Sequence, residues 1–338
     1  MTNTTTSTAA TIASTPNASP SSRPRVGISG CVLGEPVRHD GGHKRNHFVT
    51  GVLGKMVDFV SVCPEMEMGM GAPRPTLRLL FDKDRGVRLV EGKEGFDHTD
   101  AMTTWAKIRA EELATKDLDG FILQGKSPSC GMERVRVYRD SGMPHTESSS
   151  GLFAAALMQR HPMLVVEEAQ RLNDNRLRDN FCFRLFAVRR AKDLFRTKWR
   201  NGDVVDFHTK EKMALLARGR PAYLKIGQLV AKVSEFERRE FANQYLALFH
   251  AALKPLPTRG RLLDALQHMA GHFKEQLLPQ ERIEFIESMN EFQAGRLPMS
   301  AVARLLRVLA ARHQRTWVAD QSLLRPAPNA LGLYNNAF

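Results

Sequence analysis

The chain has 338 residues, of which 42% are hydrophobic and 25% charged, a balance typical of a globular protein long enough for two domains. Its apolar runs, such as 152–158 and 245–249, are short, so the sequence excludes spans of the roughly 20 apolar residues that a membrane helix needs. Four cysteines and the lack of a signal-like apolar segment argue against a secreted disulfide scaffold, and we expect a cytoplasmic protein.

The net charge of +13 is divided unevenly along the chain. Residues 1–170 carry 20 basic and 20 acidic side chains, whereas residues 171–338 carry 29 basic and 16 acidic ones. Such asymmetry is typical of a protein with a polyanionic partner, most simply a nucleic acid, although a basic surface that maintains solubility gives the same count. Nothing in the sequence indicates a membrane partner or an obligate protein partner.

The first half of the chain predicts an α/β domain. Residues 1–24 contain almost only Thr, Ser, Ala, Asn and Pro, so we expect a disordered tail there. Over residues 25–192, helical stretches such as 99–114 separate four short β-rich runs, at 26–29, 59–62, 121–123 and 163–166. This alternation predicts a largely parallel sheet, and a hairpin is expected from 77–81 and 87–90 around a turn at 82–86.

The second half predicts an all-helical bundle. Strand signals disappear over residues 193–325, and apolar residues recur at three- and four-residue spacing. The amphipathic patterns run, in order, over residues 209–218, 224–253, 259–277, 279–295 and 298–313. Residues 326–338 are predicted to form a C-terminal tail.

Three of the four cysteines follow predicted strands. Cys31 comes after the run 26–29, Cys63 after 59–62 and Cys130 after 121–123. Because ligands of open α/β sheets bind beyond the carboxyl ends of the strands, these three thiols could share one pocket. Cys182 lies in an apolar helical pattern and is predicted to be a core residue.

The spacing of the three cysteines leaves three interpretations open. They could be small buried hydrophobes, or ligands of structural zinc, although zinc usually takes four ligands in close Cys-x-x-Cys pairs and no such pair exists here. They could also hold a [4Fe–4S] cluster, in which three thiolates leave one iron open to a substrate.

The blocks around these cysteines resemble the thiouracil desulfidase family. These are VGISGCVLGEPVRHDGGHK, CPEMEMGMGAPRP and GFILQGKSPSCG, which are specific in combination. The helical half, with DFHTKEKMALLA and GRLPMSAVARLLRVL, looks like the accessory domain fused to desulfidases in bacteria. That arrangement resembles the enzymes that remove sulfur from 4-thiouridine in tRNA, and the resemblance covers about residues 25–325.

The resemblance implies that Cys31, Cys63 and Cys130 ligate a [4Fe–4S] cluster whose fourth iron has no protein ligand. It also implies that Glu65 and Ser127 are catalytic in a non-redox hydrolysis that converts 4-thiouridine in tRNA to uridine and sulfide. Free thiouracil or thiouridine nucleotides are alternative substrates, and a nucleic-acid-binding iron–sulfur or zinc sensor is an alternative of another class. Residues 124–126 depart from the more basic run of many relatives.

Basic residues near these blocks and near helix ends are candidates for substrate binding, with structural ion pairs as the alternative. Arg38, Lys44 and Arg45 follow the first cysteine and Arg74 follows the second, and all four are candidates to contact the phosphate or the base of a substrate. In the helical half the candidates for phosphate contacts are Lys210, Lys212, Arg218, Arg220, Arg259 and Arg261.

His268 and His272 have the four-residue spacing of a helical zinc motif. Met269 occupies the place of the catalytic glutamate in that motif, so we expect packing or RNA contact instead of metal binding.

Overall fold

The parallel sheet is built from the strands that the sequence predicts. The computed structural model describes residues 23–92, 95–273 and 275–336, so most of the predicted disordered tail lies outside the described residues. Strands β1 (Arg25–Ser29), β2 (Asp58–Val62), β5 (Gly120–Leu123) and β8 (Val165–Glu168) pair in the order β2-β1-β5-β8, and all neighbours are parallel. Only β8 is displaced, by two residues, because Leu164 still belongs to a turn in which its N–H donates to His161.

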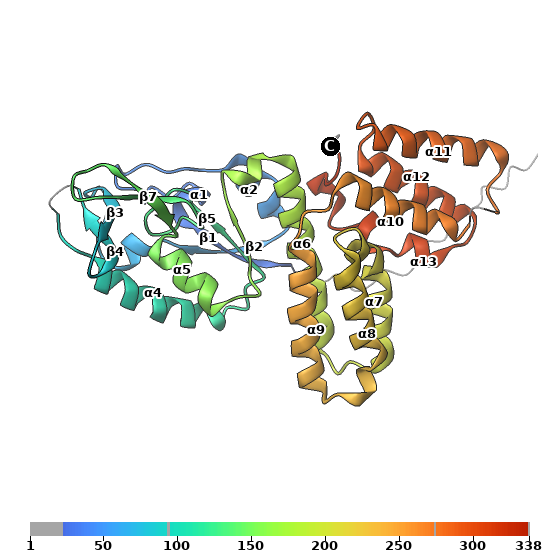
Figure 1. The fold of residues 1–338 in the computed structure, drawn as a ribbon, viewed down its shortest axis with the longest axis horizontal. Helices are drawn as coiled ribbons and strands as arrows, with labels where there is room; N and C mark the ends of the chain where they lie inside the picture. The colour runs from blue at the N-terminus through green and yellow to red at the C-terminus, as the bar shows by residue number, and fades with distance from the viewer. Residues whose placement is uncertain (1–22, 93–94, 274, 337–338) are drawn as a thin grey trace, which may run out of the picture.

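Helices cover both faces of this sheet (Figure 1). Apolar residues of α4 (Thr99–Ala114) and α5 (Leu152–Arg160) share a core with Val62, Phe121 and Leu123. On the other face, α2 (His47–Gly51) and α6 (Asn175–Arg196) pack against Val26 and Ile28. Two one-turn helices, α1 (Gly30–Leu33) and α3 (Pro64–Glu67), follow β1 and β2 directly and therefore lie at the carboxyl edge of the sheet.

A second sheet, in the order β4-β3-β6-β7, extends this domain. The predicted hairpin is confirmed as β3 (Leu77–Asp82) and β4 (Gly86–Glu91). A second hairpin, β6 (Val135–Tyr138) and β7 (Pro144–Ser149), was not expected. The sequence PHTESS of β7 is polar and mostly exposed, so it lacks the alternating apolar pattern that marks a strand.

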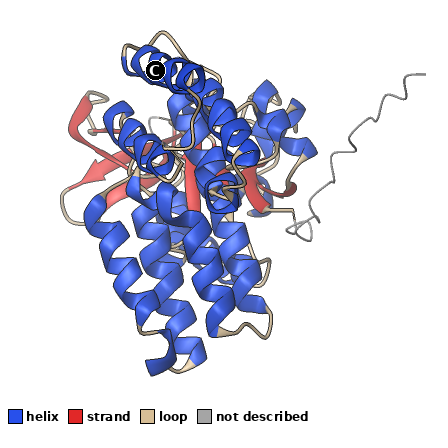
Figure 2. Cartoon of the chain, turned by 90° about the vertical axis from the view of Figure 1, so that its right-hand side faces the viewer, coloured by secondary structure: helices blue, strands red, loops and turns tan. Residues whose placement is uncertain are grey.

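Every longer element after β8 is helical among the described residues, as predicted. Figure 2 shows these helices from their own side of the molecule. They are α7 (Asn201–Leu216), α8 (Arg220–Ala231), α9 (Arg238–Leu253), α10 (Arg259–Gly271), α11 (Pro279–Gln293), α12 (Met299–Arg312) and the short α13 (Thr316–Ala319). The pattern over 224–253, predicted as one helix, is two helices separated by a 3-10 turn at Val233–Glu235. Glu237 starts α9 as its N-cap, because its carboxylate accepts the N–H groups of Arg239 and Glu240.

Helix α6 belongs to both parts of the molecule. It contributes Cys182 and Leu185 to the core of the parallel sheet, and Phe183 and Ala187 to the core of the helical part. The predicted domain boundary at residue 192 lies inside this helix. The described part of the predicted C-terminal tail also packs on both cores, since Leu331 joins the first and Tyr334 the second.

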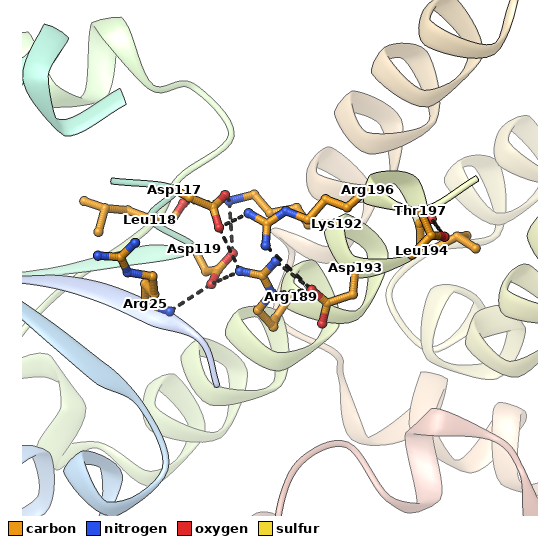
Figure 3. Close-up of polar contacts among 10 residues, drawn as sticks. All are labelled: Arg25, Asp117, Leu118, Asp119, Arg189, Lys192, Asp193, Leu194, Arg196 and Thr197. Atoms are coloured by element: carbon orange, nitrogen blue, oxygen red, sulfur yellow. Dashed lines mark hydrogen bonds and ion pairs between the residues drawn. The ribbon is translucent and has the colours of Figure 1, made fainter. Parts of the chain in front are cut away.

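A buried ion-pair network fixes α6 to the amino ends of the strands (Figure 3). The Arg189 guanidinium contacts Asp117 and Asp119 at 3.0 and 3.3 Å and Asp193 at 2.7 Å. Asp119 is fully buried and also accepts the backbone N–H of Arg25, at the start of β1.

Helices long and apolar enough to cross a membrane are absent from the described part of the chain.

Candidate functional site

Cys31, Cys63 and Cys130 line one cavity of about 570 Å³ at the carboxyl edge of the parallel sheet. Cys31 lies in α1 immediately after β1, Cys63 is the N-cap of α3 after β2, and Cys130 lies in the loop between β5 and β6. These three strands are neighbours in the sheet, so their following loops converge. All three thiols are free.

Close backbone packing positions the cysteine loops. A Cβ on Gly30 would lie 2.2 Å from a carboxylate oxygen of Glu35, and one on Gly131 would lie 2.3 Å from the Val135 side chain. The Ser127 hydroxyl oxygen accepts the N–H groups of Ser129 and Cys130 at 3.2 and 3.1 Å. These contacts hold the turn that carries Cys130. Because the Ser127 oxygen is only an acceptor in them, its hydroxyl proton is not used by either hydrogen bond.

The cavity makes all three thiols weak acids. Burial raises the pKa of Cys31 to about 11 and that of Cys63 to about 12, and it raises the pKa of Cys130 well above its usual value. The negative charge of Glu65 is the second cause in each case, which places this carboxylate near all three sulfurs. Ligation of a metal by these thiols would therefore release their protons.

Glu65 is the buried acidic group of the cavity. It is 8% exposed, and its Oε2 lies 3.5 Å from the Cys63 sulfur and 3.8 Å from the Arg74 guanidinium. Arg74 also donates to the carbonyl oxygens of Val37 and Gly71, at 3.0 and 2.7 Å. Arg74, predicted from the sequence to bind substrate, therefore orients Glu65 and ties together the loops that follow β1 and α3.

Arg38, a further candidate beside the cysteines, also lines the cavity. It pairs with Asp40 at 3.6 Å, and its positive charge favours the thiolate of Cys31. Sequence reasoning missed two polar residues of the same cavity, His39 and Gln124. Gln124 is 8% exposed, and its side-chain oxygen has no hydrogen-bond partner within the described structure. Both residues lie in the sequence blocks around Cys31 and Cys130, but nothing in those blocks gave either of them a role, and only the fold places them in the cavity.

The candidates of the helical half lie outside this cavity. Lys210 is exposed on α7, while Arg259 and Arg261 donate to the carbonyl oxygens of Gln293 and Arg218, at 3.3 and 3.0 Å. The prediction that Arg218 meets phosphate is wrong. It is 2% exposed, stacks on the Phe183 ring and donates to the Leu253 and Ala214 carbonyl oxygens.

The histidine pair has a neighbour that accounts for its position. The rings of His268 and His272 lie with their centroids 6.4 and 4.2 Å from that of Trp317. This arrangement agrees with the expectation of packing for the two histidines.

The donor set of the cavity fits a [4Fe–4S] cluster. Among the described residues, no three His, Cys, Asp or Glu side chains are arranged to hold one metal ion. A [4Fe–4S] cluster binds each thiolate ligand to a separate iron, and three free thiols from three loops around one cavity fit that donor set. Cys182 lies on α6, where it is fully buried in the core against the parallel sheet, and it does not line the cavity.

The fold and the site define an α/β domain with a three-cysteine cavity, followed by a helical domain. Comparison with known proteins gives the same division. Residues 26–169 match the model of the 2-thiouracil desulfurase family, and residues 212–328 match the model of a family described as a protein of unknown function (DUF1722). The first match supports the predicted resemblance to thiouracil desulfidases, whereas a tRNA substrate stays a prediction.

Two individual proteins are similar to parts of the chain. The uncharacterized protein YbgA of Escherichia coli (strain K12) is 23% identical over 163 residues, which are 48% of this chain and 96% of that protein. The solved structure of the [4Fe–4S]-dependent thiouracil desulfidase TudS is 26% identical, with a TM-score of 0.36, over 45% of this chain and 94% of the other.

Proposed function

We propose that this protein is an iron–sulfur-dependent enzyme that hydrolyses the C–S bond of 4-thiouridine in tRNA, giving uridine and sulfide. The observation that carries the proposal is the cavity that three free thiols from three strand ends line together with the buried carboxylate of Glu65. The match of residues 26–169 to the 2-thiouracil desulfurase family supports the same chemistry.

The three thiols would hold a [4Fe–4S] cluster with one iron free of protein ligands. When bound, this cluster supplies a soft Lewis acid that takes the thiocarbonyl sulfur and makes its carbon more electrophilic. Cys31, Cys63 and Cys130 are the ligands in this proposal.

Glu65 is positioned to act as the general base. Its carboxylate, oriented by Arg74, accepts a proton from the water that attacks the carbon bonded to sulfur. Ser127 holds the Cys130 turn through its oxygen and offers its hydroxyl proton to the pyrimidine. One water is consumed, oxygen replaces sulfur on the carbon, and sulfur leaves with the two protons of that water as hydrogen sulfide. No electrons are transferred.

The preference for tRNA over a free base rests on charge. The second half of the chain carries 29 basic and 16 acidic side chains, and Lys210, Arg220 and Arg261 are exposed there. A cytoplasmic location follows from this proposal. Free thiouracil or thiouridine nucleotides remain the competing substrates, and a nucleic-acid-binding metal sensor would need a fourth protein ligand in place of the open iron.

The test is anaerobic reconstitution of the cluster, followed by incubation with thiolated tRNA and measurement of uridine and sulfide. Serine substitution of Cys31, Cys63 or Cys130 should abolish the brown cluster absorption and the reaction. Cys182→Ser is the matched control, because this thiol lies in the core and should leave the cluster intact. A requirement for Cys182, or uridine formation by cluster-free protein, would contradict the proposal.

A further inference from the structure

A second cavity, of about 500 Å³, adjoins the cysteine cavity. The two share Lys44 and Gln170 at their common rim. The lining of the second cavity, here called the basic groove, contains no carboxylate and consists of His43, Lys44, Arg45, Asn46, His47, Ala169, Gln170 and Asn173.

The basic groove is held in place by the same elements that hold the first cysteine. The N–H of Lys44 donates to the carbonyl oxygen of Cys31 at 2.8 Å. Asn46 reaches the opposite wall, where its side-chain amide donates to the Ala169 carbonyl oxygen at 2.9 Å. The basic segment is therefore fixed between α1 and the end of β8.

Packing and a hydrogen bond also fix the position of the Arg45 side chain. A Cβ on Gly34 would lie 3.3 Å from the Arg45 side chain, and Gly34 adopts a φ of +104°, so glycine lets the arginine stem lie against this turn. The Arg45 guanidinium donates to the Thr50 hydroxyl at 3.1 Å. This contact directs the charge and does not neutralise it.

The two arginines that line the cysteine cavity have carboxylate partners, whereas the two cations of the groove do not. Arg74 is paired with Glu65 and Arg38 with Asp40. Lys44 and Arg45 are both exposed, and neither forms a salt bridge with any carboxylate of residues 23–92, 95–273 and 275–336. Two unpaired cations beside the amides of Gln170 and Asn173 match the hydrogen-bonding needs of phosphate oxygens.

Resting on the proposed function, we infer that the basic groove binds the phosphate groups attached to the thiolated nucleotide. A base that enters the cysteine cavity leaves its ribose and phosphates at the rim, and the rim residues Lys44 and Gln170 lead directly into the groove. Proteins that bind single-stranded nucleic acids divide the contacts in the same way: a positively charged groove binds the phosphate backbone, and other side chains hold the bases. The α/β domain therefore selects a phosphorylated substrate over a free base without help from the helical domain.

The test compares the wild type with the Lys44→Gln/Arg45→Gln double variant of the full-length protein. The first readout is the affinity for a short 5′-phosphorylated RNA without sulfur, measured by fluorescence anisotropy over a range of salt concentrations. Loss of two phosphate contacts should weaken binding about tenfold or more and reduce the log–log salt slope by about one to two units. The second readout is the ratio of kcat/KM for thiolated RNA to that for free 4-thiouracil, which should fall by about tenfold.

Lys83→Gln/Lys116→Gln is the matched control, since it removes the same charge from exposed sites outside both cavities. If the control loses as much RNA affinity as the Lys44→Gln/Arg45→Gln variant does, the inference is wrong. It is also wrong if that double variant loses kcat/KM to the same extent for thiolated RNA and for the free base. Measurement with 4-thiouridine 5′-monophosphate separates the sources of phosphate. A matching loss there assigns the groove to the nucleotide's own phosphate, and a loss confined to RNA assigns it to the neighbouring phosphates of the strand. If the reconstituted wild type does not desulfurate any of these substrates, the proposed function is wrong. The anisotropy comparison of wild type and double variant with RNA would still test whether the groove binds phosphate.

Discussion

Replacement of Arg189 by methionine should destabilise the protein strongly, because it breaks the buried network that joins α6 to the sheet. The Arg189 side chain is 2% exposed and Asp119 is fully buried. In the Arg189→Met variant, Asp119 keeps the Lys192 ammonium at 3.0 Å and the Arg25 N–H at 2.9 Å but loses the guanidinium. Removing one partner of a buried ion pair costs about 3–5 kcal/mol, and because Lys192 remains beside Asp119 we expect a loss of about 3 kcal/mol.

This loss corresponds to a decrease in Tm of roughly 6–12 °C, at about 2–4 °C per kcal/mol for a chain of this size class. Urea unfolding followed by tryptophan fluorescence measures it in both parts of the molecule. Trp105 packs with Phe153 beside the sheet, whereas Trp199 and Trp317 lie in the helical part.

The matched control is Arg160→Met, which breaks an ion pair with Glu111 whose two side chains are 50% and 62% exposed. Exposed pairs contribute about 0–1 kcal/mol, so this variant should unfold almost as the wild type does. A loss below about 1 kcal/mol in Arg189→Met, similar to that in the control, would refute the conclusion that the network joins the two parts. The Arg189→Met/Asp119→Leu variant should regain part of the stability, because it leaves no buried charge without its partner.

Three further predictions concern the cavity and the helical core. Glu65→Gln and Ser127→Ala should retain the cluster absorption and lose roughly 10²–10⁴-fold in kcat, since neither side chain is a proposed ligand; near-normal turnover would remove the residue from the mechanism. His39→Ala should also retain the cluster absorption, because His39 lines the cavity but is not a proposed ligand. If this variant loses the cluster, His39 is a fourth protein ligand, which favours the sensor function. Burial lowers the pKa of His208 and His250 from 6.5 to about 4 in the folded protein. As the pH falls below 6.5 the unfolded chain binds protons at these histidines before the folded protein does, so the stability present above pH 6.5 is lost toward pH 4. The loss should reach roughly 2 kcal/mol per histidine at pH 5, and urea unfolding at pH 7.5 and 5 should show a smaller difference for His208→Phe than for the wild type.

The parallel sheet could be predicted because each strand is a short apolar run that ends in turn residues. β1 and β5 are buried on both faces, so their apolar residues are continuous and easily recognised. β7 could not be predicted, because only its backbone pairing with β6 makes it a strand. The break between α8 and α9 was missed for a related reason. Apolar spacing continues across 233–236, and the extended conformation of Phe236 before the Glu237 cap has no counterpart in the periodicity.

The site could be predicted where it depends on topology and not where it depends on side-chain direction. Because parallel strands share a carboxyl edge, the positions of Cys31, Cys63 and Cys130 after strands were sufficient to predict one pocket. The role of Arg74 could not be foreseen, because an arginine beside a ligand loop has the same sequence signature whether it faces solvent or pairs with Glu65.

The structure also changes how the basic excess of the second half should be interpreted. Arg184, Arg189 and Arg218 are among its 29 basic residues, and all three are at least nine-tenths buried. A further one, Arg190, is paired with the buried carboxylate of Glu211 at 2.9 Å. These charges stabilise the packing around α6 and are not available to a polyanion. The electrically balanced first half, in contrast, holds Lys44 and Arg45 exposed beside the cysteine cavity. Because a phosphate responds to unpaired accessible charge and not to a residue count, the α/β domain should share the binding of RNA with the helical domain.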